Sequence, residues 1–269
     1  MQFQVLGPLQ LTEPGGQRAV SAPRLQQLIV LLLMARGSAL PLSALAAELW
    51  PAGPPSTADT TIRTYVHELR KLLPAGSGQL STEGTGYRLS VSWRDVDALL
   101  FEDLVGTARA RLRGAPRSCS PRAVPGPDPE LLARTAGLLT EALGLWRGGA
   151  FAGVPTGPQL DMHLADLNAQ WLRAIQLRVH IDLLLGRHRE LIGELKGLVS
   201  EFPLEDPFMA QLMVALHRSG RRGEALRAYQ MHKRLVQAEL STSPAPRLTR
   251  LRDRVLRTEC DTSVETLLR

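Results

Sequence analysis

The chain has 269 residues, of which 44% are hydrophobic and 22% are charged. This length predicts two domains, and the composition excludes a fully disordered chain, a collagen and a disulfide-dense scaffold. Its 32 Lys and Arg against 26 Asp and Glu give a formal net charge of +6, which is only a weak indication of nucleic acid or another polyanion as partner.

The sequence offers no sign of a membrane or a secreted protein. Its longest strongly apolar run covers residues 28–35, far short of the roughly 20 residues that a membrane span needs. The N-terminus lacks the basic and apolar regions of a signal peptide. Two cysteines, Cys119 and Cys260, are too few for a disulfide framework, so we expect a reduced cytoplasmic protein with no membrane partner.

The first half of the chain mixes strand and helix patterns. Residues 2–11 alternate apolar and polar side chains, which predicts a half-buried strand pair, turned at Gly7 and Pro8 or continued at residues 13–17. Pro23 opens a helix that runs to Met34 and must be almost wholly buried, and a short amphipathic helix follows over residues 42–49.

The third predicted helix, residues 57–73, is the most informative element. At 100° per residue its apolar positions fall in one narrow stripe, and polar and basic residues lie opposite. The stripe consists of Ile62, Val66, Leu69 and Leu73. Two short strands around residues 84–86 then predict a β-hairpin. Strands, three helices and a hairpin are the plan of a winged helix-turn-helix; the alternative is a small α+β domain whose third helix is solvated on one side.

Beyond residue 95 the chain is almost entirely helical in pattern, interrupted by a basic, proline-rich stretch within residues 109–122. Gly186 and Gly220 lie 34 residues apart in similar contexts, which is the tetratricopeptide spacing. We therefore predict a mainly α protein with a small β component: an N-terminal winged helix-turn-helix (α+β) over residues 1–94, then an all-α, tetratricopeptide-like helical-repeat domain over residues 95–269. Such repeats build surfaces for proteins or peptides.

Catalytic equipment is not visible in the sequence. The six histidines form no metal-binding signature, and no nucleophile-elbow, P-loop or dinucleotide-binding motif occurs. We expect no metal, no cofactor and no enzymatic activity.

The whole chain resembles the Streptomyces antibiotic regulatory protein family, from about residue 3 to residue 257. The stretches that carry the resemblance are VLGPLQL, ALAAELWP, TADTTIRTYVHELRKLL, TGYRL, DVDALLFEDLV, LTEALGLWRG, LLLGRHRELIGELKGLVSEFPL and LMVALHRSGRRGEALRAYQ. The resemblance implies an OmpR-type winged-helix domain followed by a bacterial transcriptional activator domain, in the small single-module class. It also implies an activator of a secondary-metabolite gene cluster that binds direct DNA repeats, as a dimer or as head-to-tail protomers, and recruits RNA polymerase holoenzyme at the nucleoid.

Carried over by position, the resemblance makes the third helix the recognition helix and the hairpin the wing. The candidate DNA contacts on the helix are Thr60, Thr61, Arg63, Thr64, Tyr65, His67, Glu68, Arg70 and Lys71, and those on the wing are Thr85, Tyr87 and Arg88. The basic residues are candidates for phosphate or base contacts, and Thr64 and His67 for base edges. For His67 a surface histidine without a partner is an equal alternative.

Two acidic residues depart from the family pattern, in which Arg is usual at the position of Glu68 and frequent at that of Glu83. Glu68 can accept a hydrogen bond from cytosine N4, whereas Glu83 would lie near phosphates. These charge reversals motivate an alternative function, a helical-repeat protein-interaction adaptor whose winged domain binds DNA weakly or not at all.

Overall fold

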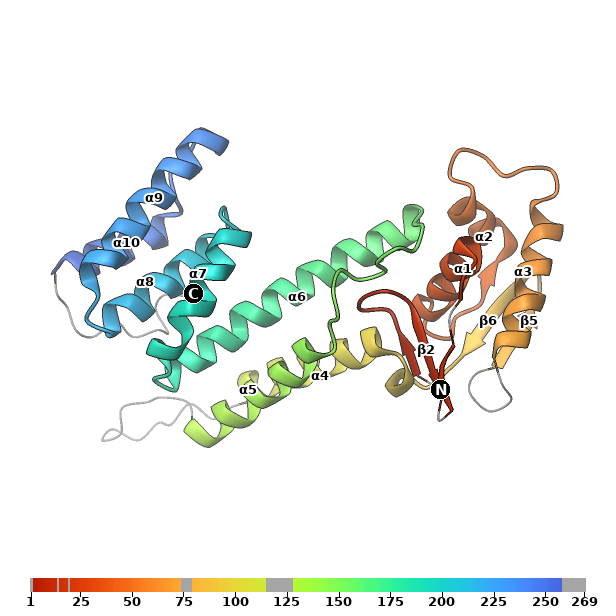
Figure 1. Ribbon diagram of the computed structural model, residues 1–269, viewed down its shortest axis with the longest axis horizontal. Coiled ribbons are helices and arrows are strands. Elements are labelled where there is room, and N and C mark those ends of the chain that lie inside the picture. The colour runs from red at the N-terminus through yellow and green to blue at the C-terminus, as the bar shows by residue number, and fades with distance from the viewer. Residues whose placement is uncertain (1, 14, 19, 74–78, 115–127, 258–269) are drawn as a thin grey trace. The chain divides into compact units, whose positions relative to one another are not determined.

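The computed structural model describes residues 2–13, 15–18, 20–73, 79–114 and 128–257 (Figure 1). The chain forms two compact units. Unit 1 comprises residues 1–109 and 140–172, and unit 2 comprises residues 110–139 and 173–269, each within the described ranges.

Unit 1 begins with a three-stranded antiparallel sheet in the order β1-β2-β3. Its strands are β1 (Gln2–Gln4), β2 (Gln10–Glu13) and β3 (Gly16–Arg18). Phe3 lies opposite Leu11, and both side chains are fully buried, as the alternating pattern predicts. The strand pair is confirmed, and the chain both turns between β1 and β2 and continues into β3.

Three helices follow: α1 (Pro23–Met34), α2 (Leu42–Leu49) and α3 (Ala58–Leu72). Pro23 occupies the first turn of α1, where its missing N–H costs nothing, and every side chain from Gln27 to Met34 is buried. On α3 the predicted apolar stripe is buried in full. That burial fixes the rotation of α3 about its axis and turns its polar side outward.

The wing contains the predicted hairpin and one strand that the sequence did not predict. Strands β5 (Gln79–Glu83) and β6 (Gly86–Ser90) pair antiparallel, and β4 (Leu40–Pro41) adds to the other edge of β6. A Cβ at Gly86 would lie 2.2 Å from the carbonyl oxygen of Leu40, so only glycine allows this pairing. The two-residue strand β4 is too short to leave a periodic signal in the sequence.

After a short 3₁₀ turn over Trp93–Asp95, three longer helices cross the division between the units: α4 (Asp97–Arg113), α5 (Pro129–Gly144) and α6 (Pro158–Leu184). Helix α4 extends through Arg113, so the first part of the predicted basic interruption is helical. Residues 115–127, which hold the rest of that stretch, lie outside the described residues.

Two buried carboxylates hold residues 140–172 onto the winged helix. Glu48, 1% exposed at the end of α2, accepts hydrogen bonds from the backbone N–H groups of Gly157, Gln159 and Leu160 at 2.7, 2.7 and 3.2 Å, and so caps α6. Asp97 accepts hydrogen bonds from the backbone N–H groups of residues 5 and 6 at 2.8 and 3.0 Å, and it pairs with the guanidinium of Arg147 at 3.6 Å. These contacts place residues that follow α5 in the same compact unit as the winged helix.

An aromatic cluster adds to this packing. The ring of Trp146 lies 5.4 Å from that of Phe101 in an edge-to-face arrangement and 5.7 Å from that of Trp171. The predicted boundary at residue 94 lies inside unit 1, and it stays a prediction for where the winged-helix domain ends.

Unit 2 contains the helical repeats, with α7 (His188–Glu201), α8 (Asp206–Arg218), α9 (Arg222–Leu240) and α10 (Pro246–Arg257) (Figure 1). Gly186 and Gly220 adopt φ values of +80° and +76°. In each turn the next residue donates its N–H to the carbonyl five residues back, Arg187 to Asp182 and Arg221 to Leu216. These are two copies of the same helix-ending motif, which agrees with the 34-residue period.

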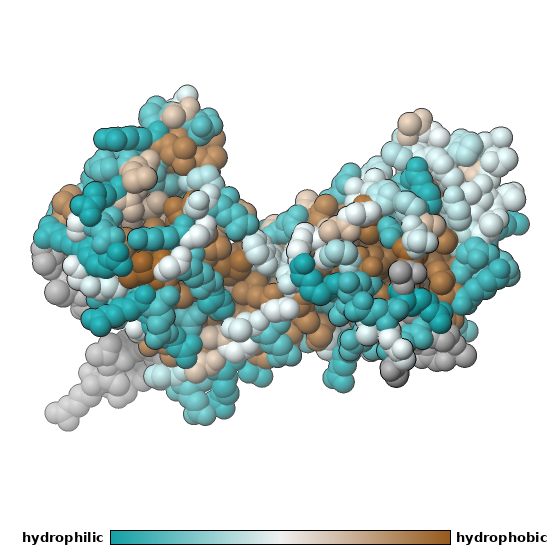
Figure 2. Space-filling view, in the orientation of Figure 1, coloured by the Kyte–Doolittle hydropathy of each residue, from teal (hydrophilic) through white to brown (hydrophobic). Residues whose placement is uncertain are grey.

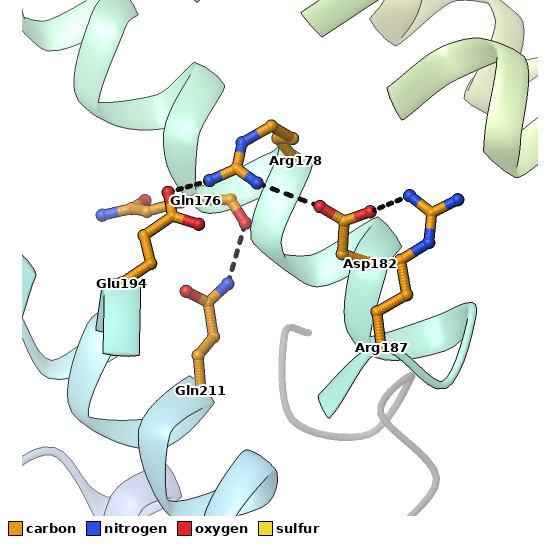
Figure 3. A network of polar contacts seen from close by, with 6 residues as sticks. All are labelled: Gln176, Arg178, Asp182, Arg187, Glu194 and Gln211. Atoms are coloured by element: carbon orange, nitrogen blue, oxygen red, sulfur yellow. Dashed lines mark hydrogen bonds and ion pairs between the residues drawn. The ribbon is translucent and has the colours of Figure 1, made fainter. Parts of the chain in front are cut away.

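A polar network joins the C-terminal part of α6 to α7 and α8 (Figure 3). Asp182 pairs with Arg178 at 3.0 Å and with Arg187 at 2.9 Å, and Arg178 also pairs with Glu194 on α7. Nearby, the Gln211 side-chain amide donates to the backbone carbonyl of Gln176. The network joins three residues of α6 to the start of α7, to α7 itself and to α8, so it contributes to how these helices pack together.

No helix among the described residues is long and apolar enough to cross a membrane.

Candidate nucleic-acid interface

Helix α3 directs a polar face away from the core, and the surface along it is mostly hydrophilic (Figure 2). Along this face the exposed side chains are Thr60, Arg63, Thr64, His67, Arg70 and Lys71, and the half-buried ones are Thr61, Tyr65 and Glu68. All nine predicted helix contacts therefore reach solvent, which is the arrangement that a helix needs in order to enter a major groove.

The threonine hydroxyls on this face are engaged with the helix itself. Thr61 donates its hydroxyl hydrogen to the carbonyl of Thr57, and Thr64 donates to that of Thr60, at 3.0 and 3.1 Å. With their hydrogens occupied, the two hydroxyls are left with acceptor lone pairs, and each side chain keeps its methyl group. These are the features that suit a base amino group or a thymine methyl.

Arg70 joins α3 to the wing. Its Nε donates to the carbonyl of Leu80 at 3.1 Å and its Nη2 to the Thr82 hydroxyl at 2.9 Å, both on β5. The guanidinium carbon also lies 5.9 Å from the centre of the Tyr87 ring on β6. Arg70 thus fixes the position of the hairpin relative to α3 in addition to carrying charge.

Two carboxylates neutralise two of the candidate cations. Glu68 pairs with Lys71 at 2.9 Å on α3, and Glu83 pairs with Arg88 at 2.6 Å across the hairpin. The hydrogen bond and the charge of Lys71 hold the pKa of Glu68 below its ordinary value. Both departures from the family pattern therefore lower the positive charge of this surface.

Arg63 differs from the other basic residues of the surface. Its side chain is exposed on α3, and within the described residues it makes no ion pair or hydrogen bond. Arg63 is therefore the candidate cation whose guanidinium is available to a phosphate or a base without breaking a contact.

On the wing the three predicted residues have different environments. Thr85 is exposed in the turn between β5 and β6, and Arg88 is half-buried. Tyr87 is 7% exposed and lies on the same face of β6 as Leu89, which is 1% exposed. The alternation along β6 turns both side chains toward the core.

The pairing of the two acidic residues with cations was not predicted, although the sequence contains a signal for it. Glu68 and Lys71 are three residues apart on a helix, which places them side by side. Glu83 lies opposite Gly86 in the hairpin, and Arg88 is two residues further along β6, so the two side chains are diagonal neighbours on one face. The buried carboxylates Glu48 and Asp97 have no comparable signal.

Groups of three or more potential metal-binding side chains do not occur within the described residues. The polar side chains on α3 and the hairpin are exposed or half-buried, which suits contact with the surface of another molecule.

A winged helix with an outward polar third helix, joined to tetratricopeptide-like helices, defines the class of winged-helix transcriptional regulators with a helical activator domain. Residues 127–256 match the family described as the Bacterial transcriptional activator domain. The chain is 33% identical to the regulatory protein DnrI of Streptomyces peucetius, over 96% of this chain and 93% of DnrI. It belongs to the Streptomyces antibiotic regulatory protein family.

Other relatives are longer than this chain. The regulatory protein AfsR of Streptomyces griseus is 35% identical over 96% of this chain, which spans only 25% of AfsR. The transcriptional regulator RedD of Streptomyces coelicolor is 27% identical over 95% of this chain and 70% of RedD.

A solved structure of Mycobacterium tuberculosis EmbR, in complex with a low-affinity phosphopeptide, is similar over 99% of this chain and 67% of EmbR, with a TM-score of 0.86 and 26% identity. That likeness agrees with the predicted fold class, a winged helix followed by helical repeats.

Proposed function

We propose that this protein is a sequence-specific DNA-binding transcriptional activator of a secondary-metabolite biosynthetic gene cluster. In this proposal α3 lies in the major groove, and the turn of the wing contacts the adjacent backbone. The observation that carries the proposal is the outward face of α3. Burial of the opposite stripe leaves Arg63, Thr64 and His67 exposed to solvent, where a partner can reach them.

The family supplies the biological setting of the proposal. The relatives with regulatory names come from streptomycetes and mycobacteria, and the matched activator domain follows the winged helix in the chain. We propose that the protein binds direct repeats near a promoter as a dimer or as head-to-tail protomers, and that unit 2 recruits RNA polymerase. No catalytic step is needed for this function.

Within the interface the residues take different parts. Arg63 contacts a phosphate or a guanine, Thr64 and His67 face base edges, and Glu68 accepts from a cytosine amino group. Arg70 positions the wing. Tyr87 stays in the core and supports the hairpin, so we leave it out of the contact set.

The test is a change of base preference on DNA from upstream of the neighbouring biosynthetic genes. Glu68→Arg should alter which base is preferred at one position of each repeat, measured by selection from a randomised duplex library. A matched charge change away from α3, Glu190→Arg on α7, should leave the preference unchanged. If Glu68→Arg also leaves it unchanged, Glu68 does not face the groove.

The adaptor is the second candidate function, favoured by the pairs Glu68–Lys71 and Glu83–Arg88, which neutralise two of the cations on the face. It predicts no sequence preference on any duplex and a salt dependence no steeper than that of an unrelated protein of the same charge.

A further inference from the structure

The winged unit carries little positive charge for a protein that binds DNA. Residues 1–100 contain eight Lys and Arg against seven Asp and Glu. On the candidate interface, Lys71 and Arg88 are paired with carboxylates, and Arg70 is bonded to the wing. Phosphate attraction supplies most of the sequence-independent affinity of a protein for a duplex. If the protein binds DNA, a further basic surface should contribute.

Helices α9 and α10 carry an excess of positive charge. Residues 222–257 contain nine Lys and Arg and only three Asp and Glu, an excess of six. This excess equals the formal net charge of the whole chain. Helix α10 alone has five arginines and a single acid, Asp253, which is already paired with Arg252 at 2.5 Å.

Four arginines of α10 form what we call the arginine stripe: Arg247, Arg250, Arg254 and Arg257. Their spacing of 3, 4 and 3 residues places them within an arc of about 80° at 100° per residue. Over ten residues the stripe extends about 15 Å along the helix at 1.5 Å per residue. All but the half-buried Arg254 are exposed, and Arg247, Arg250 and Arg257 make no ion pair within the described residues.

The stripe has a fixed orientation, because α10 is anchored on its other side. Leu248, Leu251 and Val255 are 0, 1 and 0% exposed in the core of unit 2. The Asp206 carboxylate at the start of α8 accepts the N–H of Ala245, just before α10, at 2.8 Å. Arg252 lies over the Tyr229 ring at 5.2 Å, so it belongs to the contact with α9 and not to the stripe. The four arginines are therefore held in a row on a rigid support.

We propose that the arginine stripe binds the phosphate backbone of duplex DNA, as a sequence-independent contact of unit 2. Guanidinium groups form bidentate hydrogen bonds with phosphate oxygens, and a row of them matches a backbone of regularly repeated charge. The stripe contributes affinity and no base preference. This inference deepens the proposed function, because it adds a second DNA contact to that of α3.

The test uses the full chain and a fluorescent duplex of random sequence, with affinity measured by anisotropy over a series of salt concentrations. The variant Arg247→Gln/Arg250→Gln/Arg257→Gln leaves the buried face of α10 and Arg254 untouched. If all three arginines meet phosphates, the slope of log K against log[salt] becomes shallower by about 2.7, at about 0.9 per phosphate. The same three positions changed to Lys should keep the slope of the unaltered protein.

A matched control removes the same charge elsewhere. Arg173→Gln/Arg189→Gln/Arg227→Gln replaces three exposed arginines of unit 2 that make no ion pair within the described part of the chain and form no common row. The control should retain most of the slope. An equal loss in both triple variants would show that net charge alone attracts the duplex and would overturn the proposal.

Two other results would overturn the stripe as a DNA contact. One is an unchanged slope in the stripe variant with binding to purified RNA polymerase also unchanged, which would leave the stripe without either role. The other is an unchanged slope with binding to RNA polymerase lost, which would make the stripe a protein-binding surface. Base preference is measured in the separate experiment on Glu68→Arg. A lack of base preference there would count against the proposed function, but it would not affect this test, which uses a duplex of random sequence. A thermal melt of each variant confirms that it is folded.

Discussion

At the scale of single residues, the candidate interface is governed by how its charges are paired. Glu68 and Glu83 each hold a cation that the family resemblance assigned to DNA. An ion pair exposed to solvent contributes little to stability, so a phosphate can compete for the same lysine or arginine. The two acids lower the positive charge of the surface, but their pairs can be exchanged for a phosphate.

The variant Glu68→Gln should therefore strengthen binding to a duplex of random sequence, in which a contact of Glu68 with a particular cytosine has little weight. It releases Lys71, and one more phosphate contact would steepen the salt dependence by about 0.9. Anisotropy over a salt series measures both affinity and slope. Glu190→Gln on α7 makes the same change in net charge and should leave the slope as it is. An unchanged slope in Glu68→Gln would mean that Lys71 does not reach the duplex.

Asp97 offers a second prediction at this scale, through stability. Burial raises the pKa of its carboxyl above the ordinary value, against the opposing effect of the N–H groups of Val5 and Leu6 and the charge of Arg147. A carboxyl with a raised pKa binds more protons in the folded state than in the unfolded state. Its contribution is therefore most favourable at low pH and declines as pH rises through the raised pKa.

The measurement is urea unfolding of the unaltered protein and of Asp97→Asn at a series of pH values upward from about 4. The free energy of unfolding of the unaltered protein, minus that of Asp97→Asn, should fall as pH rises through that window. A difference that is constant with pH would contradict the assignment of a raised pKa to Asp97.

At the scale of elements, the sequence predicts periodic structure well and contacts between distant segments poorly. The buried stripe of α3, the hairpin and the glycine turns of the repeats all follow from local patterns. Strand β4 was missed because two residues have no period. The role of Glu48 was missed because its partners lie about 110 residues further along the chain. The outward set on α3 was predictable from the apolar stripe that lies opposite.

The contact between α2 and the start of α6 leads to a prediction about glycine. A Cβ at Gly157 would lie 2.3 Å from the carbonyl oxygen of Glu48 and 2.9 Å from its side-chain carboxyl carbon. Gly157→Ala should therefore lower the free energy of unfolding by about 1–3 kcal/mol, as overpacking does. Gly149→Ala is the control, because a Cβ there meets no atom within 4 Å. Equal stability of the two variants in urea would show that α6 does not approach Glu48 this closely.

At the scale of the whole molecule, the compact unit that contains the winged helix is larger than the pattern of the first 94 residues indicates. It includes Asp97, Phe101 and the segment 140–172, and that whole segment lies inside the region matched to the activator domain. The sequence could not reveal this, because the contacts depend on single carboxylates and on aromatic packing, and neither is periodic.

A fragment of residues 1–94 should consequently be much less stable than unit 1 within the full chain. It lacks the two backbone hydrogen bonds to Asp97, a loss of at least about 3 kcal/mol for bonds to a charged group. It also leaves the buried α2 carboxylate of Glu48 without its partners. Hydrogen exchange of the α1 amides in the fragment and in the full chain compares the two. Equal protection would support an independent domain ending at residue 94.

The central claim, that the outward face of α3 reads DNA, is tested most directly by Arg63→Ala in the full chain. Binding is measured on promoter DNA with direct repeats and on a duplex with the repeats scrambled. We predict that the unaltered protein prefers the repeats by a factor of about a thousand or more, as specific binders do. Arg63→Ala should weaken binding to the repeats and flatten the salt dependence by about one unit if Arg63 meets a phosphate. Equal binding of the unaltered protein to both duplexes, with no effect of Arg63→Ala, would contradict the claim.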